Sequence, residues 1–172
     1  NRPMAMGSFF HLAGFDPLSE ERRKELVELV REEMSKGRFR FYNPNFLNVN
    51  TYHRDHSSPN MTRFGGNPDD VKDLTAAELS TRAEVWKLVR YLQQNVPEFR
   101  NCYVQQTSAQ IGPRESRQIV GPYVLSGEDV RSGAKFPDAI ARGSWWIDIH
   151  CPRGETYPAH LCVVECAKGE EC

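Results

Sequence analysis

The sequence predicts an α+β fold, in which a mixed or antiparallel sheet has two long helices packed on one face. Two segments, residues 19–37 and 75–95, combine capping residues with apolar side chains at helical spacing. Several shorter segments alternate apolar and polar residues, as half-buried strands do. Most of these predicted strands do not follow one another directly along the chain, which favours an α+β layer.

The bulk composition is that of an ordinary globular protein. The chain has 172 residues, of which 39% are hydrophobic and 26% charged, and its net charge is -1. We therefore expect one domain over residues 1–172, with no general attraction to nucleic acid or to an anionic membrane. No apolar run approaches the roughly 18 residues that cross a bilayer. The five cysteines are an odd number, which favours reduced thiols and a cytoplasmic location.

The first half of the chain predicts a strand, a helix and a hairpin. Residues 3–15 are apolar and fit one buried strand that ends at Gly14. Ser19 has the position of an N-cap and Gly37 that of the residue after the helix. Residues 38–53 alternate around a break at Asn-Pro-Asn, which is typical of a hairpin.

The second half begins with a polar loop, residues 54–73, and a second helix. The sequence Thr75-Ala-Ala-Glu78 fits a capping box, and the helix is predicted to end near Asn95. Its expected core face consists of Leu79, Ala83, Trp86, Val89 and either Leu92 or Gln93.

The remaining segments predict short elements. Strands are expected at residues 101–112, 114–120 and 144–152, a short turn of helix after Ser126 with Asp129 in its third position, and another short helix over residues 137–143.

Two arginines lie close together between two Gly-Pro turns. Alternation along a strand places Arg114 and Arg117 on opposite faces. In one interpretation, one guanidinium binds the carboxylate or phosphate of a ligand, because it is a planar bidentate donor, and the other pairs with an acid such as Glu115. In the other, both arginines form structural ion pairs, which on chemistry alone is the more common arrangement.

The same stretch carries a family resemblance. The segments IGPRESRQIVGPYVLSGEDV (residues 111–130) and FPDAIARGSWWIDIHCPRG (residues 136–154) resemble the middle part of the FAD-dependent oxidoreductase family. The similarity extends over roughly residues 43–154 and follows the order and spacing of the family's motifs. Gln118 replaces a second consecutive arginine, and the chain has no Gly-x-Gly-x-x-Gly, the loop that holds the pyrophosphate of a dinucleotide.

The resemblance implies a substrate-binding domain, a fragment of a larger flavoprotein whose separate domain binds FAD. It also implies that Arg114, Arg117 and Asn60 bind substrate or cofactor and that His150 is catalytic, moving a proton beside the flavin. A half-buried histidine that donates to a loop carbonyl is the alternative for His150. For Asn60 the alternative is an asparagine that serves only the turn, which on chemistry alone is the more common arrangement. The expected partners are the FAD-binding domain and a small-molecule substrate. We expect the chain alone to be inactive, to retain no FAD and to be prone to form a homodimer.

A different class of function is a metal-binding or interaction module built on the C-terminal stretch. That stretch gathers potential zinc ligands: His150, Cys151, His160, Cys162, Cys166 and Cys172. The signal is weak, because no Cys-x-x-Cys pair is present. Unlinked thiols account for the stretch better, and no metal ligand is assigned from the sequence.

Overall fold

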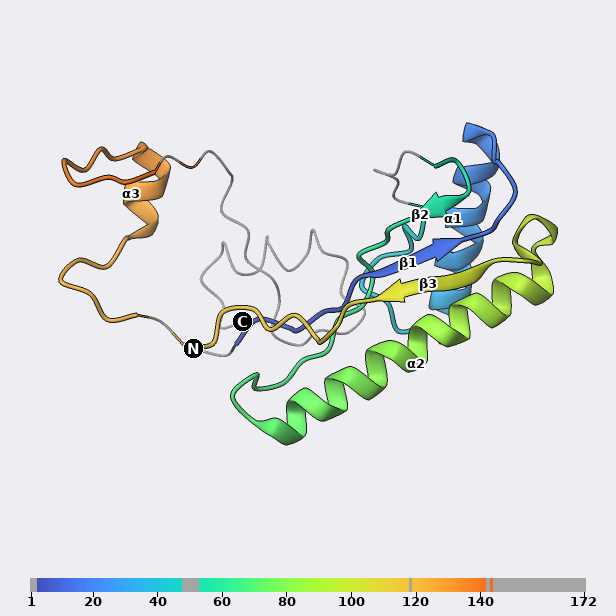
Figure 1. The fold of residues 1–172 in the computed structure, drawn as a ribbon, viewed down its shortest axis with the longest axis horizontal. Coiled ribbons are helices and arrows are strands. Elements are labelled where there is room, and N and C mark those ends of the chain that lie inside the picture. Colours follow the sequence, from blue (N-terminus) through green and yellow to red (C-terminus); the bar gives the residue numbers. More distant parts are fainter. Residues whose placement is uncertain (1–2, 48–52, 118, 142, 144–172) are drawn as a thin grey trace. The chain divides into compact units, whose positions relative to one another are not determined.

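The computed structural model describes residues 3–47, 53–117, 119–141 and 143 (Figure 1). These residues form two compact units. The described part of the first unit extends to Ser116, and the second begins at Arg117. Each unit is described by itself.

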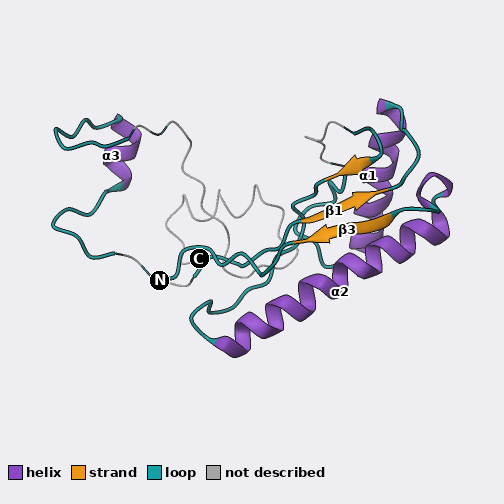
Figure 2. Cartoon of the chain, viewed as in Figure 1, coloured by secondary structure: helices purple, strands orange, loops and turns teal. Residues whose placement is uncertain are grey.

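A three-stranded antiparallel sheet lies in the first unit (Figure 2). Its strands are β1 (Phe10–Ala13), β2 (His56–Ser57) and β3 (Tyr103–Thr107), in the order β2-β1-β3. β1 pairs antiparallel with both neighbours, with an irregularity between His11 and Leu12 on the β3 side. The α+β prediction is therefore confirmed, as is the strand within residues 101–112. The buried strand predicted over residues 3–15 is confirmed only for residues 10–13.

Helix α1 (Glu20–Ser35) begins and ends as the sequence predicts. The Ser19 hydroxyl accepts a hydrogen bond from the backbone N of Arg22 at 3.1 Å. Gly37 follows the C-cap with a φ of 76°, a conformation that favours glycine.

Helix α2 (Val71–Asn95) runs alongside β3 and begins about one turn before the predicted capping box (Figure 1). Its N-cap is Asp70, whose carboxylate accepts from the backbone N of Lys72 at 2.8 Å. Thr75 lies inside the helix, where its hydroxyl donates to the carbonyl of Val71 at 2.8 Å. The predicted start was therefore wrong, because an aspartate in the polar loop already satisfies the first free N–H groups. None of the described helices has the length and hydrophobicity that crossing a bilayer requires.

The core face of α2 also differs from the prediction. Leu79 and Trp86 are 69% and 47% exposed, and Ala83 is exposed as well. Only Val89 and Leu92 of the predicted set are buried. The buried face contains two polar residues, Thr81 and Glu84, together with Ala77, Val85, Leu88, Val89 and Leu92. A prediction based only on the spacing of hydrophobic residues therefore assigns part of the exposed side of α2 to the core.

The main core is rich in aromatic side chains, which come from the sheet, the segment after α1 and the end of α2 with the short turn that follows it, while α1 contributes Leu26 and Val30. Phe15 and Phe99 stack with ring centroids 4.7 Å apart, and Phe39 meets Tyr91 edge-on at 5.4 Å. In the described part of the predicted hairpin, residues 38–47 and 53, no strand forms. The hairpin prediction was wrong there, because Phe39 and its neighbours are buried by packing against helices and not by a β-ladder; residues 48–52 lie outside the description.

In the second unit, helix α3 (Gly127–Ser132) has the predicted capping box. Two further predictions for residues 114–143 were wrong. Residues 114–117, 119 and 120 form no strand, and Ile119 and Val120 are 96% and 93% exposed. The described part of residues 137–143 contains a turn and no helix. The predicted strand at 144–152 lies outside the described residues.

Candidate ligand-binding site

Two short antiparallel bridges bring three distant segments together next to the sheet. Met6 pairs with Phe64 through backbone hydrogen bonds of 2.9 and 2.8 Å, and Gly7 pairs with Gly112 at 3.2 and 2.8 Å. Residues 6–7 therefore connect the loop that contains Asn60 to the segment that contains Arg114. Asn60 and Arg114, two of the four predicted site residues, therefore lie on segments that pair with the adjacent residues Met6 and Gly7.

Side chains of α2 hold the third segment in place. The Nη2 atom of Arg82 donates to the carbonyl of Ser108 at 3.0 Å, and Glu78 accepts from the backbone N of Ile111. Arg82 and Glu78 are themselves paired at 2.9 Å. A second small core lies here, formed by Met6, Ala77 and Ile111, with Phe64 and Leu74 packed against it. The bridged segments that carry Asn60 and Arg114 are therefore held by this small core and by hydrogen bonds from α2.

Asn60 lies beside a buried guanidinium, that of Arg63, which is 7% exposed. The Nη1 atom of Arg63 donates to Oδ1 of Asn60 at 3.0 Å and to the carbonyl of Thr62 at 2.9 Å. Its Cζ atom lies 3.9 Å from the ring centroid of Tyr42, close enough for a cation–π contact. Sequence reasoning missed Arg63, although it lies three residues from Asn60 in the same loop.

Gly7 permits this close packing. A Cβ atom at Gly7 would lie 2.8 Å from Nη1 of Arg63 and 2.9 Å from the carbonyl O of Thr62. Any side chain at this position would displace either the guanidinium or the neighbouring backbone. The glycine therefore fixes how near residues 6–8 approach the Asn60–Arg63 pair.

Arg114 is half-buried, two residues beyond the Gly112 bridge. Its Nε atom is buried and has no hydrogen-bond partner within the part of the chain that the structure describes. None of the ion pairs found among the described residues includes Arg114. A buried donor without a partner costs free energy, so such an atom calls for an explanation.

The structure does not place the other two predicted site residues, Arg117 and His150, relative to these loops. Arg117 is exposed and belongs to the second unit. His150 and the histidine and cysteine residues of the C-terminal stretch lie outside the described residues. Cys102 is described and is buried in the core, where burial raises the pKa of its thiol to about 11. Such a thiol is unreactive at neutral pH.

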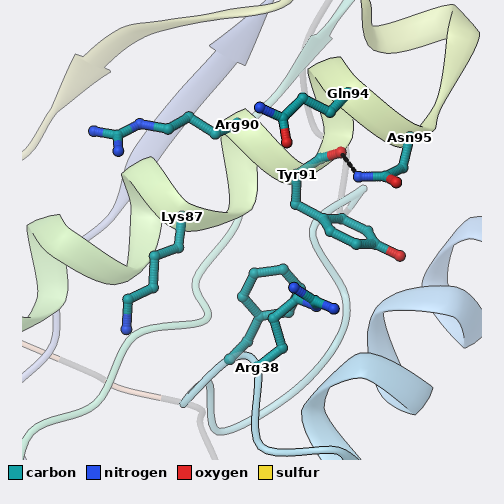
Figure 3. A pocket seen from close by; sticks show the side chains of 7 residues that line it. Arg38, Lys87, Arg90, Tyr91, Gln94 and Asn95 are labelled. Carbon is teal, nitrogen blue, oxygen red and sulfur yellow. Dashed lines mark hydrogen bonds between the residues drawn. The ribbon is translucent and has the colours of Figure 1, made fainter.

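A separate cavity of 480 Å³ lies between α2 and the segment that follows α1 (Figure 3). It is lined by Arg38, Phe39, Lys87, Arg90, Tyr91, Gln94 and Asn95. Its cations are largely balanced, because Arg38 pairs with Glu33 and Lys87 pairs with Glu84. None of the site residues predicted from the sequence is among the residues that line this cavity.

The fold and the bridged segments define an α+β protein in which one buried and one half-buried arginine, Arg63 and Arg114, lie on two loops held together by backbone bridges. The whole of this arrangement falls within a family match. Residues 6–168 match the model of the FAD dependent oxidoreductase family, and the chain belongs to that family. No curated protein and no solved structure matches the chain.

The described helix ends do not fit the pyrophosphate of FAD. A pyrophosphate needs free N–H groups at a helix N-terminus and no nearby negative charge. The first turn of α1 carries Glu20 and Glu21 behind the capping Ser19. The first turn of α2 carries Asp73 behind the capping Asp70. Glu128 and Asp129 make the first turn of α3 acidic as well. The N-termini of the described α-helices therefore offer no cradle for that group.

Proposed function

We propose that this chain forms the substrate-binding wall beside the flavin of an FAD-dependent oxidoreductase. The observation that carries the proposal is the buried Nε of Arg114, which has no partner among the described residues. A ligand carboxylate or phosphate would supply the missing acceptor, because a guanidinium binds such groups with two parallel hydrogen bonds. The substrate class favoured is therefore a small anionic molecule.

Asn60 is the second proposed contact. Arg63 engages Oδ1 of Asn60 at 3.0 Å, and the carbonyl of Asn60 accepts from Nδ2 of Asn43 at 3.1 Å. These two contacts hold the asparagine in one orientation, which leaves its Nδ2 group to donate to a ligand. A rigid amide of this kind orients a substrate without the cost of ordering a mobile side chain.

The proposed roles of Arg117 and His150 rest on the family motif alone. In this proposal Arg117 binds substrate or cofactor, and His150 accepts a proton as the bound substrate is oxidised. A separate FAD-binding domain is the proposed partner, because the described residues here do not fit the pyrophosphate.

The test measures the binding of small carboxylic acids and inorganic phosphate to the full chain by isothermal titration calorimetry. Arg114→Gln is expected to weaken anion binding by about 10- to 100-fold, as loss of a charged hydrogen bond does, without a change in the far-UV circular dichroism of the protein. The control is Arg131→Gln, because Arg131 is exposed on α3 and paired with Glu128 at 3.0 Å. Anion binding that is unchanged in Arg114→Gln would contradict the proposal.

A further inference from the structure

A tight turn before β2 brings together three side chains that are common metal ligands. The backbone N of His56 donates to the carbonyl of His53 at 3.3 Å and closes the turn. The turn is tied to β1, because Gly14 donates to the carbonyl of Asp55 at 3.1 Å and Ala13 pairs with His56. In a turn closed in this way, the first and fourth residues lie side by side.

The three side chains converge on one point. One ligand atom from each of His53, Asp55 and His56 lies within 4.8 Å of the other two. Oδ1 of Asp55 is 2.8 Å from Nδ1 of His56, and the two imidazole centroids are 4.9 Å apart. Metal–ligand bonds of about 2.0–2.1 Å place tetrahedral ligand atoms about 3.3 Å apart. Side-chain rotations that shorten the longest separation by roughly 1–1.5 Å would complete the geometry.

We propose that His53, Asp55 and His56 bind a divalent first-row transition metal ion, for which Zn²⁺ is a suitable probe. Two imidazoles and one carboxylate are a donor set that such ions accept, with the remaining position taken by water or by a further ligand. With both imidazoles neutral, the set carries one negative charge, which favours a cation.

Access and surrounding charge are compatible with this assignment. The side chains of His56 and Asp55 are 20% and 47% exposed, and His53 is exposed. A hydrated ion can therefore reach all three. Arg54, the remaining residue of the turn, opposes a cation, but its side chain is exposed, so that water and salt screen its charge. This site is independent of the proposed function, because it uses none of Asn60, Arg63 and Arg114.

The experiment measures zinc binding to the full chain, freed of metal with a chelator, by isothermal titration calorimetry at neutral pH. His53→Ala is the principal variant, because His53 is exposed and its loss does not disturb the sheet; Asp55→Asn is the second. Each is expected to weaken binding at least about tenfold, since even the loss of an outer partner of a ligand costs that much. The control is His11→Ala, which removes a histidine of β1 outside the cluster.

Cobalt substitution separates this cluster from the cysteine-rich tail. Co²⁺ bound by two imidazoles and a carboxylate gives visible d–d bands without a thiolate charge-transfer band. A thiolate band, unchanged zinc affinity in both His53→Ala and Asp55→Asn, or a Kd for the unmodified chain above about 0.1 mM would each overturn the proposal.

Discussion

The guanidinium of Arg114 can be tested for a structural role by its effect on stability. Its buried Nε has no hydrogen-bond partner within the described residues, so Arg114→Gln removes an unsatisfied donor and breaks no bond of the described structure. We expect the free energy of unfolding in urea to stay the same or to rise by up to about 1 kcal/mol.

The matched comparison is Arg63→Gln, because Arg63 is the other arginine on these bridged segments and its side chain is buried. It lies over Tyr42 and donates to Asn60 and to a carbonyl, so its removal is expected to cost about 1–3 kcal/mol. Equal losses in the two variants would mean that Arg114 is structural.

Glu33 makes a pH-dependent contribution to stability. Its side chain is 8% exposed and accepts from Nζ of Lys36 at 2.8 Å and from Nε of Arg38. The hydrogen bonds from Lys36, then from Arg38, lower the pKa of the Glu33 carboxyl. The stabilisation is therefore fully present above the ordinary glutamate pKa, near 4.3, and is lost as the pH falls through the lower pKa of the folded state.

Glu33→Gln is accordingly expected to be less stable than the unmodified chain at pH 7, and the difference should shrink as the pH is lowered from about 5 to 3. Urea unfolding of both proteins across this range measures it. Glu28→Gln is the control, because its pair with Arg31 is exposed and such pairs contribute little. A difference that is the same at every pH would contradict this account.

At the scale of elements, two residues are candidates for the N-cap of α2: Asp70, which caps the helix in the structure, and Thr75, which the sequence predicts. Asp70 accepts from the backbone of Lys72, whereas Thr75 lies one turn inside. Asp70→Ala is expected to lower the free energy of unfolding by about 1 kcal/mol, and Asp70→Asn to retain most of the cap. Thr75→Ala is expected to be neutral or slightly stabilising, because alanine is the better helix former. Chemical denaturation of the three variants measures these changes. A larger loss of unfolding free energy in Thr75→Ala than in Asp70→Ala would mean that Thr75 caps the helix, as the sequence predicts.

The two helices also show which elements the sequence can predict. α1 has a single candidate at each end, Ser19 and Gly37, and both are used. α2 has two candidate caps, and its buried face includes a glutamate, Glu84, that has a partner distant in sequence. Glu84 accepts from the backbone N of Arg40, a contact that no local pattern reveals. The strand prediction after Arg114 failed because residues with strand propensity form strands only where a partner strand is present.

At the scale of the whole molecule, the sequence identified the two loops of the candidate site but not how they meet. Asn60 and Arg114 were singled out separately, and residues 6–7 were assigned only to a buried strand. The bridges from Met6 to Phe64 and from Gly7 to Gly112 join segments more than 40 residues apart. Such pairing depends on tertiary packing, in this case on the small core beneath the bridges. Arg63 was missed for the same reason, because an arginine in a polar loop is usually exposed.

At the same scale, the chain taken as a whole is not expected to hold FAD by itself. The chain belongs to a family of FAD-dependent enzymes, yet it contains no Gly-x-Gly-x-x-Gly. The first turns of α1 and α2 are acidic and already capped, so each would repel a pyrophosphate. We therefore expect the chain, mixed with excess FAD and then desalted, to be colourless.

Flavin absorption and fluorescence of the desalted protein measure what remains bound. Addition of an FAD-binding domain from another member of the family is the positive arm of the experiment, since the flavin would then be held by that domain and its spectrum would respond to contact with this chain. A stoichiometric flavin band in the desalted chain alone would mean that residues outside the described part hold the cofactor. The division of roles proposed for Arg114 and the partner domain would then have to be abandoned.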